Sequence, residues 1–114
     1  MHEVALIEQT IEILRSSVQA NEIKQVTKVK IVVGQMTAAQ PEALKFAFEV
    51  FSLQEDWLQG SSLEIEDKEI TASCLNCDTI YTVSNYRFVC PVCSSTAHRV
   101  ESGRELYIDY YEGD

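Results

Sequence analysis

The sequence predicts an α+β fold, in which a small sheet with two flanking helices is interrupted by an inserted cysteine-rich domain. Three observations support this prediction. Apolar residues recur at spacings of three and four in two segments, which indicates two amphipathic helices. Other segments alternate apolar and polar residues, as strands with one buried face do. All four cysteines lie in one stretch between the last two of these strands.

The first helix is expected over residues 3–19, because one face of that segment is apolar throughout. Its stripe consists of Val4, Ile7, Ile11, Leu14 and Val18. A second helix is expected from Pro41, since proline suits the first helical position, where its missing N–H would have no partner. Its apolar stripe, which we interpret as core, consists of Leu44, Ala47, Phe48 and Phe51.

Three strands are expected to form the sheet. In residues 27–33, three apolar side chains share one face and two lysines the other: Val29, Ile31 and Val33 against Lys28 and Lys30. The turn at residues 60–62 leads into a second strand with Leu63 and Ile65 inward. Residues 105–111 alternate as a last strand, which we expect to return to the first sheet.

Residues 71–102 form the predicted inserted domain, and residues 1–70 together with 103–114 form the domain that it interrupts. The inserted segment has few large apolar side chains. It therefore cannot build a hydrophobic core alone, and its cysteines are expected to hold it together.

The cysteines form two CxxC knuckles separated by twelve residues, Cys74 with Cys77 and Cys90 with Cys93. Each knuckle aims two thiolates at one ion, and two facing knuckles complete the tetrahedral geometry of structural Zn(II). The inserted domain is thus predicted to be a zinc ribbon. An iron site of the same geometry and thiol redox chemistry are the alternatives.

The composition limits the classes of partner. Among 114 residues, 46% are hydrophobic, and 18 acidic against 9 basic residues give a net charge of -9. This field repels phosphate backbones, so we expect no nucleic-acid partner. No stretch approaches the roughly 20 apolar residues that span a membrane, and Glu3 and Glu8 stand where a secretory signal would be basic. We therefore expect a cytoplasmic protein with no membrane partner, in which disulfides are disfavoured.

Met1-His2-Glu3 supplies a second candidate metal site. The Met1 α-amine, the His2 amide once deprotonated and the His2 imidazole close two chelate rings around one ion. Their common plane suits Ni(II) or Cu(II), and three donors leave one planar position open for transfer. At a helix start the His2 amide also lacks an intrahelical acceptor. His98, the only other histidine, is a candidate for the open or an axial position.

Three other functions fit parts of the sequence. A zinc-ribbon module that binds protein or nucleic acid would need a basic, aromatic face. The insertion offers three arginines and three aromatic residues: Arg87, Arg99, Arg104, Tyr81, Tyr86 and Phe88. A thiol oxidoreductase would need one exposed cysteine of low pKa at a helix start, which two symmetric knuckles fit poorly. A nickel enzyme would need a nearby general base or nucleophile; we find none and predict a non-enzymatic protein.

Several motifs, in order along nearly the whole chain, resemble one family. They are Met1-His2-Glu3 at the head of a helix, Val32-Val33-Gly34, Pro41-Glu42-Ala43-Leu44, the two knuckles, and Gly103-Arg104-Glu105-Leu106. Together they closely resemble the nickel metallochaperones of the hydrogenase maturation accessory type, the HypA/HybF family.

The resemblance implies an α/β nickel-binding domain and a zinc-ribbon domain. It implies delivery of Ni(II) to the large subunit of nickel-iron hydrogenase, and in some members to urease, together with a GTPase accessory protein. His2 matches the nickel ligand, and Glu3 contributes its backbone or supports the site. The four cysteines match the ligands of structural zinc, whereas histidines near His98 vary in placement. The first helix spans only two heptads, so we expect a monomer or a weak homodimer.

Overall fold

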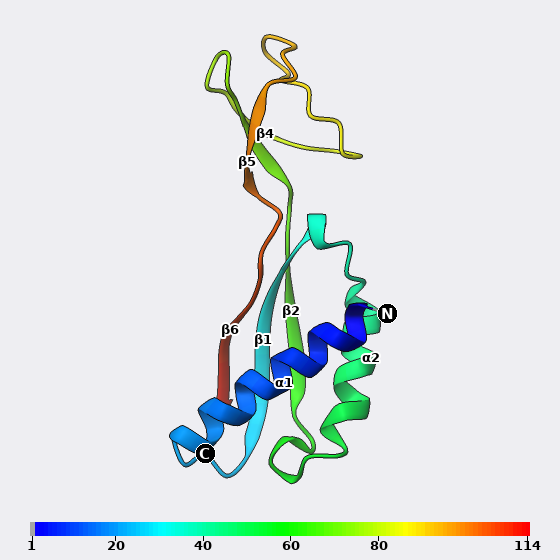
Figure 1. Ribbon diagram of the computed structural model, residues 1–114, viewed down its shortest axis with the longest axis vertical. Helices are drawn as coiled ribbons and strands as arrows, with labels where there is room; N and C mark the ends of the chain where they lie inside the picture. Colours follow the sequence, from blue (N-terminus) through cyan, green and yellow to red (C-terminus); the bar gives the residue numbers. More distant parts are fainter. Residues whose placement is uncertain (1) are drawn as a thin grey trace. The chain divides into compact units, whose positions relative to one another are not determined.

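The structure, a computed structural model, describes residues 2–114 and combines α-helices with short β-sheets (Figure 1). The chain falls into two compact units. The first consists of residues up to Ile31 with residues 39–66 and 107–114, and the second consists of residues 32–38 and 67–106. The strands form two three-stranded sheets. The predicted α+β class is therefore confirmed.

The two predicted helices are α1 (His2–Ala20) and α2 (Pro41–Ser52), both in the first unit. α1 buries four residues of its predicted stripe, but the fifth, Val4, is 37% exposed. The first turn of α1 therefore adds little to the core. Two short 3-10 helices, η1 (Gln35–Thr37) and η2 (Asp56–Leu58), lie where no element was predicted. Within residues 2–114, no helix has both the length and the apolar character that a membrane span requires.

The first sheet has β1 (Val26–Gly34) at its centre, between β2 (Ser62–Lys68) and β6 (Leu106–Gly113). Backbone hydrogen bonds join Gln25 to Asp114 in both directions, and Gly34 N–H donates to Glu105. The two ends of β1 thus meet opposite ends of β6, so these strands run antiparallel. The strand after the cysteine segment returns to the first sheet, as predicted, and it pairs there with β1.

The lysines of β1 lie opposite its buried face, where they bridge neighbouring strands. Lys28 Nζ lies 3.0 Å from Glu64 Oε1, and Lys30 Nζ lies 3.1 Å from Glu66 Oε1 and 3.4 Å from Asp109 Oδ2. Val29, Ile31 and Val33 are buried as predicted, but Val32, which alternates onto the face of the lysines, is buried as well. Each lysine contacts carboxylates on an adjacent strand, which favours this strand pairing over a shifted one.

The second sheet has the order β4 (Ile80–Thr82), β3 (Thr71–Cys74), β5 (His98–Ser102), with both pairs antiparallel. A small core is buried in this unit, and it consists of Ile70, Ala72, Cys74, Tyr81, Val83 and Cys90. Met36 packs against this core, which explains why residues 32–38 belong to the second unit. The unit is thus larger than residues 71–102, and those domain boundaries stay a prediction.

Two glycines of the second unit approach each other closely. A Cβ built on Gly34 would lie 2.1 Å from the carbonyl oxygen of Gly103, and Gly103 has φ of +120°. The same carbonyl accepts a hydrogen bond from Met36 N–H at 2.8 Å. Side chains are therefore excluded at Gly34 by contact and at Gly103 by backbone conformation.

Candidate metal centres

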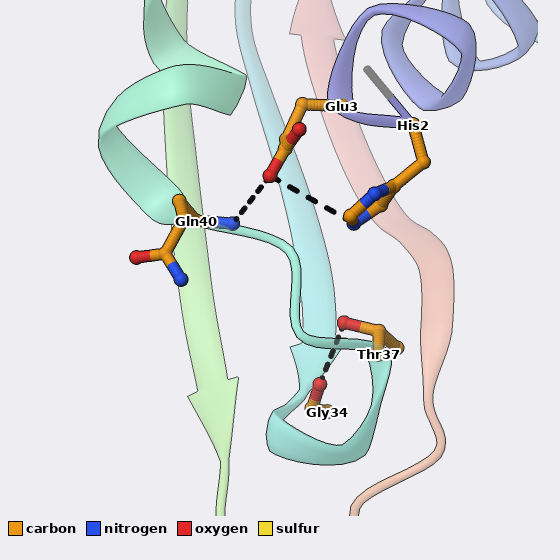
Figure 2. A network of polar contacts seen from close by, with 5 residues as sticks. All are labelled: His2, Glu3, Gly34, Thr37 and Gln40. Atoms are coloured by element: carbon orange, nitrogen blue, oxygen red, sulfur yellow. Dashed lines mark hydrogen bonds and ion pairs between the residues drawn. The ribbon is translucent and has the colours of Figure 1, made fainter.

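The N-terminal candidate site lies at the first turn of α1, in the first unit (Figure 2). Glu3 Oε2 accepts a hydrogen bond from the backbone N–H of Gln40 at 3.2 Å. The same oxygen lies 3.7 Å from Nε2 of His2. Gln40 is the residue before α2. The Glu3 carboxylate therefore ties the start of one helix to the start of the other, with the His2 imidazole beside it.

The Glu3 carboxylate is held in its ionised form. Hydrogen bonds from its own backbone N–H and from that of Gln40 lower the pKa of Glu3, and the nearby His2 ring acts in the same direction. Its side chain is only 16% exposed, whereas that of His2 is 53% exposed. Glu3 is thus already engaged by the protein, and the imidazole is accessible.

The predicted donors of this site fall into two groups. His2 begins α1, so the N–H groups of this turn lack intrahelical acceptors, as expected. Met1, whose α-amine is a predicted donor, lies outside the described residues. Gln40 was missed, because no local pattern reveals that a backbone N–H distant in sequence meets Glu3.

The second candidate site consists of the four cysteines, in the second unit. Their Sγ atoms all lie within 4.8 Å of one another. The closest pairs join the two knuckles, Cys74 to Cys93 at 3.5 Å and Cys77 to Cys90 at 3.6 Å. Tetrahedral ligands with bonds of about 2.3 Å are separated by about 3.8 Å. The observed separations therefore fit one ion held by four thiolates.

The two knuckles have the same local geometry. In the first, Cys74 N–H donates to Thr79 and Asp78 N–H donates back to Cys74; in the second, Cys90 N–H donates to Ser95 and Ser94 N–H to Cys90. Asp78 and Ser94 both have φ of +64°. These turns place the first cysteine of each knuckle inside the small core and leave the second accessible.

Hydrogen bonds lower the pKa of Cys90 and of Cys93, whereas burial raises the pKa of Cys74 despite the N–H groups that donate to it. Backbone N–H groups of Asn76 and Val92 each donate to the first sulfur of their own knuckle at 3.4 Å. The side chain of Asn76 reaches across to Cys93 Sγ at 3.4 Å. With the N–H of Ser95, it lowers the pKa of Cys93 to about 6. Asn76 is a second residue that the sequence prediction missed, although it lies inside the first knuckle.

His98 belongs to the second unit and His2 to the first. His98 begins β5, in register with Cys74. Its Nδ1 lies 2.8 Å from the carbonyl oxygen of Thr96, and its ring stacks on Phe88 with centroids 4.2 Å apart. Because Nδ1 then carries the proton, Nε2 retains the lone pair that a metal would use.

The residues expected to form a basic, aromatic face are partly engaged elsewhere. Tyr81 is buried in the small core, and burial raises its pKa. Phe88 stacks on His98, and Arg99 pairs with Glu101 at 3.4 Å. The set therefore does not present a continuous surface of the kind that stacks bases and contacts phosphates.

Comparison with known proteins gives one consistent result. A family model described as hydrogenase/urease nickel incorporation, metallochaperone, hypA matches residues 1–113. The hydrogenase maturation factor HypA of Moorella thermoacetica is 35% identical over 115 residues, with 100% of both chains covered. The guanidine hydrolase-activating protein A of Synechocystis sp. is 41% identical over 95 residues, which cover 82% of this chain and 78% of that protein.

Two solved structures have the same fold. The solution structure of the Ni metallochaperone HypA from Helicobacter pylori aligns with a TM-score of 0.68 and 20% identity, covering 97% of this chain and 96% of that one. The solution structure of a further HypA protein aligns with a TM-score of 0.74 and 21% identity, covering 99% and 96%. At these identities, the similarity concerns the fold.

Proposed function

We propose that this chain, which belongs to the HypA family of hydrogenase and urease nickel-incorporation metallochaperones, binds Ni(II) at its N-terminus and passes it to a nickel enzyme during maturation. The ligands in this proposal are the Met1 α-amine, the His2 amide and the His2 imidazole. Glu3 contributes its backbone or supports these ligands with its side chain. The protein acts as a carrier, and we propose no catalytic residue.

The observation that best supports this proposal is the position of His2. Its imidazole is exposed at the first turn of α1, next to a carboxylate that Gln40 holds in place. Ni(II) favours nitrogen donors in a plane, and three such donors leave a position for a ligand from the receiving protein. Binding would release protons from these donors.

We further propose that the four cysteines hold a resident Zn(II). Four thiolates at these separations suit a tetrahedral ion, and such a closed site contributes folding energy instead of binding substrate. Phe88 and Thr96 already orient His98, so His98 is proposed as an additional nickel ligand, separate from the zinc set.

The proposed partners are a GTPase accessory protein and the large subunit of nickel-iron hydrogenase, with urease as a further client. One relative of higher identity, from Synechocystis, is described as activating guanidine hydrolase. The client therefore needs its own test, in which the purified, nickel-loaded chain is offered to each metal-free enzyme and the recovered activity is measured.

The test of nickel binding is a calorimetric titration of zinc-loaded protein with Ni(II). His2→Ala, which removes the imidazole, and a variant acetylated at its N-terminus, which removes the amine as a donor, should each weaken binding at least about 100-fold. Both should keep their zinc. His98→Ala tests the additional nickel ligand, and a smaller loss of affinity than in His2→Ala would rank the two histidines.

Two results would contradict the proposal. Unchanged nickel affinity in both terminal variants would place the nickel elsewhere. Loss of nickel binding only when the thiols are blocked would assign nickel to the cysteines.

A further inference from the structure

A groove runs between α1 and the C-terminal part of α2 in the first unit. Its volume is about 540 Å³, and its lining includes Glu8, Glu12 and Arg15 of α1 with Phe51, Gln54 and Glu55. Neither proposed metal site uses these residues. The groove is therefore a separate feature of the surface.

The groove is acidic. Arg15 pairs with Glu55, so these two charges compensate each other. Glu8 and Glu12 add two negative charges one helical turn apart, which is mildly unfavourable for an isolated helix. A cationic ligand would relieve this repulsion.

Next to the groove, α2 and its C-cap residue expose an apolar stripe, defined here as Phe46, Val50 and Leu53. Their exposed fractions are 67%, 41% and 71%. Positions four and three apart lie along one side of a helix, so these side chains form a continuous strip. Leu53 of this stripe is followed directly in the chain by Gln54 and Glu55, which line the groove. The apolar stripe therefore meets the groove at the end of α2.

We propose that this groove and stripe bind an amphipathic helix of a partner protein, one that carries leucine-like residues on one face and lysine or arginine along its edges. A groove between two helices with apolar anchors at helical spacing is a surface that such a segment fits. The basic edges are required by Glu8 and Glu12. A second copy of this chain fits poorly, because its net charge of -9 would oppose its own.

The groove lies close to the N-terminal candidate metal site along α1. Glu8 lies six residues after His2 in α1, which is about 9 Å along the helix axis. A helix docked there would bring its protein close to the N-terminal turn. This inference concerns docking alone, and nickel-free protein tests it independently of the proposed function.

The probes are two synthetic helical peptides of about 18 residues, long enough to span the groove. Both carry leucine at helical spacing on one face; one has lysine along the edges and the other has glutamate. Isotope-labelled, zinc-loaded and nickel-free protein is titrated with each peptide by NMR. The lysine peptide should shift the signals of Phe46, Val50, Phe51 and Leu53, and the glutamate peptide should bind at least about tenfold more weakly.

Variants separate the contributions of charge and apolar surface. Glu8→Gln with Glu12→Gln should weaken the lysine peptide about tenfold and reduce its dependence on salt. The double variant Phe46→Ser with Leu53→Ser should weaken binding of the lysine peptide at least as much. Ile13→Ser, which changes a residue 62% exposed elsewhere on α1, is the apolar control. Glu22→Gln is the charge control, and both controls should bind as the parent does.

Three outcomes would overturn the proposal. Equal affinity for both peptides would remove the electrostatic argument. Peptide shifts centred outside the groove and stripe would place the site elsewhere. Self-association of the parent protein that Phe46→Ser with Leu53→Ser abolishes would identify a second copy as the occupant.

Discussion

The two candidate metal centres differ in how completely the fold assembles them. In the second unit, four thiols lie within 4.8 Å of one another, and backbone N–H groups already point at two of them. In the first unit, the imidazole of His2 is 53% exposed and lies beside a carboxylate held by Gln40. The cysteine centre thus offers four ligands for one ion, whereas the His2 centre offers only part of a ligand set.

Under the proposed function, this difference would let one small chain retain one metal ion and transfer another. A complete tetrahedral set leaves no position for an incoming ligand, so an ion leaves only if the local fold opens. An incomplete planar set lets a receiving protein bind the ion before release. The following predictions test this distinction, beginning with the largest expected effect.

The substitution Cys90→Ser should abolish metal binding at the thiol centre and unfold the second unit. Structural metal sites contribute about 10 kcal/mol or more of folding energy, and the small core around Cys90 has little else to stabilise it. Metal analysis and NMR spectra would show both losses, with signals of α1 and α2 retained. Leu75→Ser, at a residue 58% exposed in the other knuckle, should change neither. A well-folded second unit without metal would contradict this view.

Acidification should release nickel well before the thiol-bound metal. Protons compete with Ni(II) for all three nitrogen donors of the terminal chelate, whereas the cysteine set includes a thiol, Cys93, whose pKa is lowered to about 6. A lowered pKa keeps the thiolate present as pH falls toward that value. Nickel affinity should therefore drop at least about 100-fold between about pH 7.5 and 5.5. Competition titrations with a chelator would measure the release of each metal as the pH falls. Release of both metals at the same pH would contradict the difference between the two centres.

The substitution Asn76→Ala should weaken the thiol centre without unfolding it. It removes the side-chain hydrogen bond to Cys93 Sγ, and such supporting contacts typically change metal affinity by about tenfold or more. Metal transfer to a chelator at fixed pH is the measurement. Asn21→Ala, which affects an exposed amide at the end of α1, is the control. Equal transfer rates in both variants would show that the bond is incidental.

The substitution Glu3→Ala should weaken nickel binding about fivefold, the smallest of these effects. It releases Gln40 N–H and frees the first turn of α1 while leaving all three proposed nitrogen ligands intact. Because the pKa of Glu3 lies below its usual value, the contribution should be constant at neutral pH and fall only under acid conditions. Calorimetry of Glu3→Ala, Glu3→Gln and the control Glu42→Ala measures it. Complete loss of nickel binding in Glu3→Ala would indicate that the Glu3 carboxylate is itself a nickel ligand.

Local sequence patterns predicted both α-helices and the three strands of the first sheet, because the responsible interactions are local. Apolar periodicity located α1 and α2, and the CxxC spacing predicted which four side chains would meet. The lysines of β1 were placed correctly because strand residues alternate. Each of these predictions required only the neighbours within a few residues.

Long-range contacts were missed for a physical reason. Nothing near Glu3 in the sequence indicates that Gln40 will donate to it, and nothing in residues 32–38 shows that Met36 packs on the small core. The stripe of Phe46, Val50 and Leu53 was also missed. A helix with apolar residues on two faces does not reveal from sequence alone which face is buried.

The strand order of the first sheet has a consequence for how the protein is made. β6 pairs with β1 but follows residues 67–106 in the chain. During synthesis, β1 therefore has one unpaired edge until the cysteine segment and then β6 have left the ribosome. The thiols can collect their ion during this interval, and the sheet closes only afterwards. A shortage of metal at that time would therefore leave a nascent chain with an unpaired strand edge, a target for chaperones or for aggregation.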